Sequence, residues 1–368
     1  MTDTTTEWVE ATIGEALLER AQREGTPLID GETVTFVWQG PDAPQLIGDF
    51  NNWGWGPGKP LDMLKVGPEV WAQSVKIPLD AYIEYTYIQD GRRPRDPFNP
   101  RLVDNGIGMW NQFFRMPVSE PTPLIKKRRS VPHGTLTRHM LDGGHLVVGG
   151  HRAVHLYQPP TGEPTPLLVV LDGQDYLKRA RLPYIVDNLI AQGRMRPISL
   201  AMVEHGGQAR FVEYMCNEST IAFLLRHVVP LALAHLSLLD IADHPGAYGV
   251  MGTSMSGLMS LYTGVRVPEV FGRVLCQSGS FAFEVLHHEL VIFDLVERHD
   301  ARPVNIWMDV GRFEFLVPSN RRMYALLREK GYQVAYNEFP GEHNFTSWRD
   351  DLWRGLEALF PPNAASAD

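Results

Sequence analysis

A serine stands among small residues where an expected strand gives way to an expected helix. The stretch Gly246 to Gly257 reads Gly-Ala-Tyr-Gly-Val-Met-Gly-Thr-Ser-Met-Ser-Gly, which predicts a strand over 248–251 and a helix starting near Met255. A sharp turn between them would hold the Ser254 hydroxyl exposed at the carboxyl edge of a sheet, where a nucleophile can reach its substrate. The same pattern also fits an ordinary strand-to-helix turn, so the hypothesis depends on chemical partners elsewhere.

A serine hydroxyl is a weak nucleophile at neutral pH and needs a base, which in turn needs an orienting acid. His343 lies in the run Pro-Gly-Glu-His-Asn, on a loop before the last expected helix. Glu314 follows the expected strand 304–310, three residues after Gly311, and Asp309 at that strand's end is the alternative acid. The order serine, acid, histidine is the order found in α/β-hydrolases.

Attack on a carbonyl also needs two converging N–H donors for the oxyanion. One is expected to be the amide of Met255, directly after the serine. The other is expected from the loop that follows the strand 166–171, with Gln174 as the first choice and Gly173 as the second. A plain Asp-Gly turn is the alternative interpretation of this loop.

The second half of the chain alternates expected strands and helices, as a doubly wound, mostly parallel sheet requires. Apolar runs such as Leu167 to Leu171 are typical of parallel strands covered on both faces. Sites in such sheets lie at the carboxyl ends of the strands. The expected strands are 135–141, 153–157, 166–171, 198–203, 248–251, 273–277, 304–310 and 333–339, and the expected helices are 178–192, 219–236, 254–264, 283–298, 318–330 and 346–360.

The first part of the chain has a different pattern of apolar residues. Residues 7–23 carry apolar side chains at helical spacing, and this amphipathic helix could serve a homodimer contact. Short alternating runs follow at 33–38, 45–48, 70–77, 82–89 and 112–116, which predict a small all-β, Ig-like sandwich. We therefore expect an N-terminal helix over 1–24, a sandwich over 25–118, a proline-rich linker over 119–134 and an α/β-hydrolase domain over 135–363.

Composition narrows the functional classes. The 368 residues carry a formal net charge of −9, which argues against nucleic-acid or anionic-membrane binding. No apolar stretch is long enough for a signal peptide or a membrane span, so a cytoplasmic location is expected. Cys216 and Cys276 stand in unrelated contexts, and no group of residues has metal-ligand spacing. The expected chemistry needs neither a metal nor a cofactor, and the expected partner is a small-molecule ester.

The N-terminal motifs resemble the glycogen-binding-type module found at the front of enterochelin esterases. They are Leu-Ile-Gly-Asp-Phe-Asn-Asn-Trp at 46–53, Val-Trp at 70–71 and Tyr-Thr-Tyr-Ile-Gln-Asp-Gly at 85–91. In such modules exposed tryptophans stack on sugar rings, which would make Trp53, Trp55 and Trp71 candidates. Packing within the sandwich or shaping of a neighbouring site is the alternative role.

The rest of the chain resembles the esterase D branch of the α/β-hydrolases, and the whole resembles enterochelin esterase. The motifs are Leu-Asp-Gly-Gln-Asp-Tyr at 171–176, Gly-Thr-Ser-Met-Ser-Gly at 252–257, Gly-Arg-Phe-Glu at 311–314 and Gly-Glu-His-Asn-Phe-Thr-Ser-Trp-Arg at 341–349. The resemblance implies triad roles for Ser254, Glu314 and His343. It also implies a place near the substrate for the segment 210–217, and the side chains expected there are Arg210, Glu213, Asn217 and Trp348.

The expected reaction is hydrolysis of a carboxylic ester, either a siderophore-type lactone or a small aryl or acyl ester. Two alternatives are a carbohydrate-linked (feruloyl or acetyl) esterase and a non-catalytic glycan-binding protein on a hydrolase scaffold. Ser256 departs from the family pattern because it stands where the elbow usually has a second glycine. A highly anionic substrate would need a cationic site, for which the sequence offers Arg210, Arg312, Arg349 and Arg354.

Overall fold

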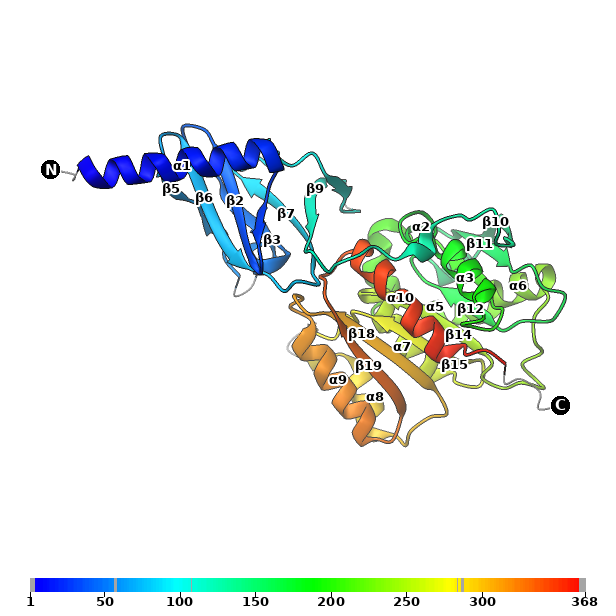
Figure 1. Cartoon of the computed structure of the whole chain (residues 1–368). Helices are drawn as coiled ribbons and strands as arrows, with labels where there is room; N and C mark the ends of the chain where they lie inside the picture. Colours follow the sequence, from blue (N-terminus) through cyan, green and yellow to red (C-terminus); the bar gives the residue numbers. More distant parts are fainter. Residues whose placement is uncertain (1–3, 56–57, 107, 283, 286–287, 364–368) are drawn as a thin grey trace. The chain divides into compact units, whose positions relative to one another are not determined.

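A computed structural model describes residues 4–55, 58–106, 108–282, 284–285 and 288–363 (Figure 1). The chain divides into two compact units, which are described here one at a time. The first contains Met1–Pro121 and two short later segments, Gly311–Phe315 and Pro340–Asn344. The second contains the remaining parts of the chain. No helix among the described residues is both long enough and apolar enough to cross a membrane.

The first unit is built from one long helix and two antiparallel sheets. Helix α1 (Thr4–Glu24) precedes them. In the described residues, one sheet has the order β1-β2-β6-β5 and the other the order β4-β3-β7-β9-β8. The strands are β1 (Leu28–Asp30), β2 (Thr33–Gln39), β3 (Gln45–Gly48), β4 (Leu61–Asp62), β5 (Leu64–Gly67), β6 (Val70–Lys76), β7 (Tyr82–Ile88), β8 (Leu102–Asp104) and β9 (Trp110–Arg115).

The core of this unit lies between its two sheets. Phe36 on β2 meets Tyr85 on β7 with ring centroids 4.8 Å apart, and Phe114 on β9 packs against both rings at 6.0 Å. Helix α1 packs on the unit through a smaller cluster in which its buried Ala21 lies with Val37 and Val70. The expected homodimer contact of this helix stays a prediction.

The two late segments are held in the first unit by its own contacts. Phe313 packs against the sandwich core, and the Tyr82 amide donates to the Pro340 carbonyl at 3.2 Å. Arg312 forms an ion pair with Asp80 at 2.5 Å. These segments carry Glu314 and His343, so the candidate acid and base pack with the sandwich although they follow strands of the other unit.

The second unit contains a mixed, mostly parallel sheet. Its order in the described residues is β10-β11-β13-β12-β14-β15-β18-β19. The pairs from β13 through β18 are parallel, while β10 and β11 form an antiparallel edge. The strands are β10 (Thr135–Asp142), β11 (His151–Gln158), β12 (Leu167–Val170), β13 (Ser199–Val203), β14 (Tyr248–Thr253), β15 (Phe271–Gln277), β18 (Asn305–Gly311) and β19 (Gln333–Phe339).

Helices cover both faces of this sheet, as its apolar strands require. Leu167 and Val169 of β12 point into one core, and Leu168 and Val170 point into the other. Helices α5 (Glu218–Phe223), α6 (Val229–His235), α7 (Met255–Arg266), α8 (Val291–Arg298) and α9 (Val317–Glu329) contribute to the first core, and α2 (Gly173–Lys178), α3 (Leu182–Ala191) and α10 (Phe345–Leu359) to the second. This is the α/β-hydrolase architecture predicted from the sequence.

Three expected elements differ in detail. The helix expected over 178–192 begins only at Leu182, as α3, because α2 ends at Lys178 and Arg181 between the two helices lies in the left-handed region at φ 54°. The helix expected over 219–236 is interrupted by a π-helical stretch, η5 (Leu224–Val228), before Pro230. The helix expected over 283–298 begins only at Val291, because short strands β16 (Glu284–Val285) and β17 (His288–Glu289) pair before it. Residues 283 and 286–287 of that prediction lie outside the described part of the chain.

The segment expected as a linker is partly folded onto the second unit. It contains the short turn η2 (Pro123–Ile125), whose Leu124 is buried with residues of α3 and β12. The Asn188 side-chain amide of α3 donates to the Leu124 and Lys126 carbonyls at 2.7 and 3.0 Å.

Candidate active site

The turn at Ser254 has the backbone of a strained nucleophile elbow. Ser254 has φ 59° and ψ −120°, between β14 and α7. A Cβ at Gly252 would lie 2.6 Å from Ser256, and a Cβ at Gly257 would lie 2.9 Å from the Gln277 carbonyl, so both positions need glycine. A positive φ at serine is costly and persists only where the surroundings impose it. The conformation that the sequence pattern predicted is therefore present.

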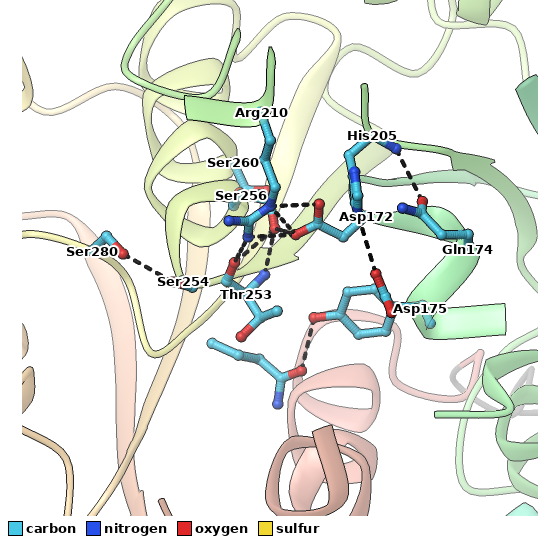
Figure 2. A network of polar contacts seen from close by, with 12 residues as sticks. Asp172, Gln174, Asp175, His205, Arg210, Thr253, Ser254, Ser256, Ser260 and Ser280 are labelled. Carbon is cyan, nitrogen blue, oxygen red and sulfur yellow. Dashed lines mark hydrogen bonds and ion pairs between the residues drawn. The ribbon is translucent and has the colours of Figure 1, made fainter. Parts of the chain in front are cut away.

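Residues at the end of the neighbouring strand β15, and just after it, hold this turn. The Ser254 amide donates to the Gln277 carbonyl at 2.9 Å, and the Ser280 amide donates to the Ser254 carbonyl at 3.1 Å. The two hydroxyls of Ser254 and Ser280 lie 3.1 Å apart (Figure 2). Sequence reasoning missed Ser280; its place two residues after the Cys-Gln-Ser end of a parallel strand was the available signal.

The loop expected to complete the oxyanion hole follows β12, which pairs in parallel with β14. Both loops therefore emerge at the same edge of the sheet. Asp172 has φ 55° and starts α2, so that Gly173 and Gln174 supply first-turn amides, which have no partner within their own helix. A Cβ at Gly173 would lie 2.4 Å from the Met202 backbone, which requires glycine there. The Gln174 side chain accepts a hydrogen bond from the His205 amide at 3.0 Å.

A polar network joins the two loops (Figure 2). The Nε and Nη2 atoms of Arg210 donate to the Asp172 carboxylate oxygens at 2.7 to 3.0 Å, and Nη2 also donates to the Thr253 carbonyl at 3.2 Å. Ser256 donates to the same Asp172 carboxylate at 2.7 Å. Burial alone would lower the pKa of the Arg210 guanidinium, but the Asp172 carboxylate more than offsets this and raises that pKa above its ordinary value. Arg210 is thus the half-buried partner in a bidentate ion pair with the buried Asp172.

Glu314 and His343 lie together in the first unit. His343 Nδ1 lies 2.7 Å from Glu314 Oε2, and the Gly311 amide donates to Glu314 Oε1 at 2.8 Å. The Glu314 side chain is fully buried, whereas the His343 side chain is 26% exposed. A buried carboxylate on Nδ1 fixes the orientation of the imidazole and the tautomer that carries a proton on Nδ1.

The alternative acid, Asp309, has other partners. It lies inside β18, and its Oδ2 atom accepts from the Trp307 indole at 2.9 Å and from the Gln277 side-chain amide at 3.4 Å. These contacts hold together β15 and β18 at the core of the sheet. The contact between Glu314 and His343 makes Glu314 the better candidate.

Further carboxylates are buried close to Glu314. Asp49 accepts from the Trp53 indole at 2.9 Å and from the Glu84 amide at 2.7 Å, and Glu342 accepts from the His343 amide at 2.5 Å. Burial, and then the charges of Asp49 and Glu314, raise the pKa of Glu342 well above its ordinary 4.5. Burial and the charge of Glu84 similarly raise the pKa of Asp49. The sequence pattern did not indicate this group of carboxylates, whose members come from distant parts of the chain.

The other residues expected near the substrate make internal contacts. Glu213 accepts from Arg152 and, at 2.8 Å, from the Val148 amide. Asn217 caps α5 by accepting from the Ser219 amide at 2.8 Å, and the buried Trp348 indole donates to the Ser278 hydroxyl at 2.8 Å. Substrate contacts by these side chains stay predictions.

The tryptophans expected to bind sugar differ in exposure. The Trp53 and Trp71 indoles donate within the first unit, to Asp49 and to the Gly40 carbonyl at 3.0 Å. Trp55 is 75% exposed. Sugar binding by these residues stays a prediction.

The mixed, mostly parallel sheet and the strained serine turn define an α/β hydrolase. A family model described as "Putative esterase" matches residues 147–359, and the chain belongs to that family. The protein is therefore an esterase, a carboxylic ester hydrolase.

Two curated relatives match the chain to different extents. It is 26% identical to an iron(III) enterobactin esterase of Dickeya dadantii, over 96% of this chain and 95% of the relative. It is 27% identical to the iron(III) enterobactin esterase of Escherichia coli K12, over 55% of this chain and 51% of the relative.

Solved structures show the same fold. The ferric enterobactin esterase from Salmonella typhimurium superposes with a TM-score of 0.73 at 22% identity, covering 89% of this chain and 93% of that one. A ferulic acid esterase from the anaerobic fungus Anaeromyces mucronatus gives a TM-score of 0.54 at 17% identity over 65% of this chain and 96% of that one.

Proposed function

We propose that the chain is a serine esterase whose triad is Ser254, His343 and Glu314. Ser254 is the nucleophile, His343 is the general base and then the general acid, and Glu314 orients the imidazole. The hydrogen bond of 2.7 Å between His343 Nδ1 and Glu314 Oε2 supports this most directly. With Nδ1 engaged by the carboxylate, Nε2 is the ring atom that exchanges a proton with the nucleophile and the leaving group.

The reaction proceeds through an acyl-enzyme. The Ser254 oxygen bonds to the ester carbonyl carbon while its proton passes to His343, and the carbonyl oxygen becomes an oxyanion. Collapse of this intermediate breaks the bond to the alcohol oxygen, which takes the proton from His343. Water then attacks the acyl-enzyme with His343 as base, and the acid leaves as Ser254 recovers its proton.

The oxyanion is held by two backbone amides, that of Met255 and that of Gln174, with the Gly173 amide as the alternative. Met255 opens α7 directly after the nucleophile, and its amide is a first-turn donor. The loop after β12 emerges beside the elbow at the same sheet edge, which favours convergence of the two donors. Donors fixed before the reaction stabilise the developing charge without reorganising.

The substrate proposed is a small, uncharged aryl or acyl ester rather than a polyanionic siderophore complex. Each of the four arginines that the sequence offered for an anionic substrate has a carboxylate partner. The pairs are Arg210–Asp172, Arg312–Asp80, Arg349–Asp350 and Arg354–Asp351, at 2.7, 2.5, 2.9 and 2.9 Å. Paired arginines present little net positive charge. A panel of p-nitrophenyl esters, feruloyl sugars and a ferric catecholate trilactone tests this; fastest turnover of the trilactone would contradict it.

Replacement of the nucleophile tests the proposal as a whole. Ser254→Ala should lower kcat for p-nitrophenyl butyrate by about 10⁴-fold or more, because it removes the proposed nucleophile that forms the acyl-enzyme. Ser260→Ala is the control, since it removes a nearby serine hydroxyl: Ser260 is fully buried on α7, and its hydroxyl donates to the Ser256 carbonyl at 2.7 Å. Equal rates for wild type and Ser254→Ala would exclude the mechanism and favour a non-catalytic binding role.

A further inference from the structure

Ser256 stands where this turn usually has a glycine, and its hydroxyl lies between Thr253 of the elbow and Asp172 of the loop after β12 (Figure 2). It accepts from the Thr253 amide at 2.8 Å and donates to Asp172 Oδ2 at 2.7 Å, with the Thr253 carbonyl at 2.8 Å as a second acceptor. The charged carboxylate is the stronger acceptor. Ser256 itself is fully buried. One hydroxyl therefore links the elbow directly to the loop after β12.

Asp172 is the residue on which the geometry of that loop depends. Its left-handed backbone turns the chain from β12 into α2, and its carbonyl accepts from the Asp175 and Tyr176 amides at 2.9 and 3.2 Å. A non-glycine residue keeps such a conformation only when its surroundings hold it there. The two first-turn amides of α2, at Gly173 and Gln174, follow immediately. Anything that moves Asp172 moves these donors.

Two groups hold the Asp172 side chain, and they act differently. Arg210 lies outside the turn and donates hydrogen bonds to the Asp172 carboxylate. It also donates to the Thr253 carbonyl of the elbow at 3.2 Å. Arginine is long and has many rotatable bonds. Ser256 is short, lies on the rigid first turn of α7, and its contacts at 2.7 and 2.8 Å leave little freedom. The serine thus adds a short, direct link between the two loops beside that of the arginine.

We propose that Ser256 is a positioning residue that sets the distance between the two oxyanion donors. Its hydroxyl bonds to Asp172 and so fixes the position of the Gly173 and Gln174 amides. These donors are then held at the distance from the Met255 amide, beside Ser254, that an oxyanion requires. This inference rests on the proposed esterase function and goes beyond it, because it assigns a catalytic purpose to the residue that breaks the family pattern. Ser256 acts through the backbone of its neighbours and does not touch the substrate.

The expected kinetic signature follows from this role. Oxyanion donors stabilise the transition state more than the bound ester, so their misplacement lowers kcat and leaves KM nearly unchanged. Ser256→Ala keeps the Cβ and removes only the hydroxyl. We expect kcat to fall at least about tenfold and KM to stay within about twofold, measured on p-nitrophenyl butyrate. The fraction of reactive Ser254, titrated with an aryl phosphonate, should remain that of the wild type.

Ser260→Ala is the matched control, because it makes the same change one turn later on the same buried helix. A kcat for Ser256→Ala equal to that of Ser260→Ala would overturn the proposal. If Ser256→Ala lowers the phosphonate-reactive fraction of Ser254 by the same factor as kcat, the proposal is also overturned. That outcome means that part of the protein is unfolded and that the folded part is fully active. If Ser256→Ala does not fold, Ser256→Gly restores the usual elbow residue, removes the same hydroxyl, and should show the same fall in kcat.

A double-mutant cycle tests whether the effect passes through Asp172. Asp172→Asn and Ser256→Ala should each lower kcat, and the double variant should lose far less than the product of the two single losses. Independent, multiplicative losses would contradict the bridge. The result is separable from the proposed function: if Ser254→Ala abolishes turnover while Ser256→Ala does not affect it, the triad stands and the positioning role fails.

Discussion

At the scale of single residues, the candidate acid is distinguished by its contacts rather than by its type. Asp309 lies within β18 and Glu314 follows that strand, and both side chains are buried. Glu314 contacts the His343 ring, while Asp309 accepts from the Trp307 indole and the Gln277 amide within the sheet. The sequence placed both carboxylates near one sheet edge and could not rank them by contact, because that depends on the path of a loop after β18.

Replacing each acid by its amide tests this assignment. Glu314→Gln should lower kcat by about 10³-fold, because the amide favours the wrong tautomer of His343. Asp309→Asn keeps most of the shape of the core and should lower kcat by less than about tenfold, with a loss of stability of about 1–3 kcal/mol from its altered hydrogen bonds. The measurement is turnover corrected for the folded fraction. A larger kcat effect at Asp309 would reassign the acid.

At the scale of elements, the β12–α2 junction depends on how closely a helix start can approach a strand. Gly173 lies against the backbone of β13, with a Cβ there placed 2.5 Å from the Val203 nitrogen. The sequence predicted a loop after this strand and proposed its amides as donors. It could not show the contact with β13, which arises because β13 and β12 are neighbours in the sheet.

Gly173→Ala should therefore destabilise the protein and damage catalysis together. The added methyl has to displace β13 or the start of α2, at a cost of about 2 kcal/mol or more, and displacement of α2 should lower kcat. Gly162→Ala is the control, since a Cβ at Gly162 meets nothing within 4 Å. It should change the free energy of unfolding by no more than about 0.5 kcal/mol. Urea unfolding and p-nitrophenyl ester turnover measure the two effects, and similar results for both variants would refute the explanation.

At the scale of the whole molecule, the first unit gathers residues from opposite ends of the chain. Asp49 and Glu84 come from its N-terminal sheets, and Glu314 and Glu342 come from loops more than two hundred residues later. Like charges buried together favour the protonated form of some of them. The pKa of Glu342 is raised by burial and by Asp49, Glu314 and Glu84, against the opposing hydrogen bond from the His343 amide.

This arrangement predicts how stability depends on pH. As pH rises above 4.5, the ordinary pKa of a glutamate, the unfolded chain loses the Glu342 proton before the folded chain does. The folded state then binds more protons than the unfolded state, so the free energy of unfolding falls with rising pH. Glu342→Gln keeps an oxygen acceptor for the His343 amide and removes this proton linkage. The variant should be more stable than wild type at about pH 8, with the difference shrinking toward about pH 5.

Thermal unfolding over that pH range provides the measurement. Glu329→Gln at the end of the exposed face of α9 serves as a control for loss of one carboxylate. A stability difference that is constant with pH, or that grows toward acid, would contradict the linkage.

The sequence by itself indicated most of the elements and the residue types of the candidate site. Apolar periodicity marks the strands and helices, and the Gly-x-Ser turn marks the elbow, because both patterns are local and follow from backbone geometry. The order of serine, acid and histidine was likewise readable along the chain. In the sequence, Ser256 could be recognised only as a replacement of the second glycine of the elbow. Nothing in the sequence indicated what its hydroxyl contacts.

Only the tertiary structure decided which polar groups meet. The Ser256–Asp172 bond joins residues 84 apart, and the Arg210–Asp172 pair joins residues 38 apart. The structure also assigned the loops of Glu314 and His343 to the same unit as the sandwich. Such contacts follow from strand order and packing between distant segments, which leave no periodic signal in a single sequence.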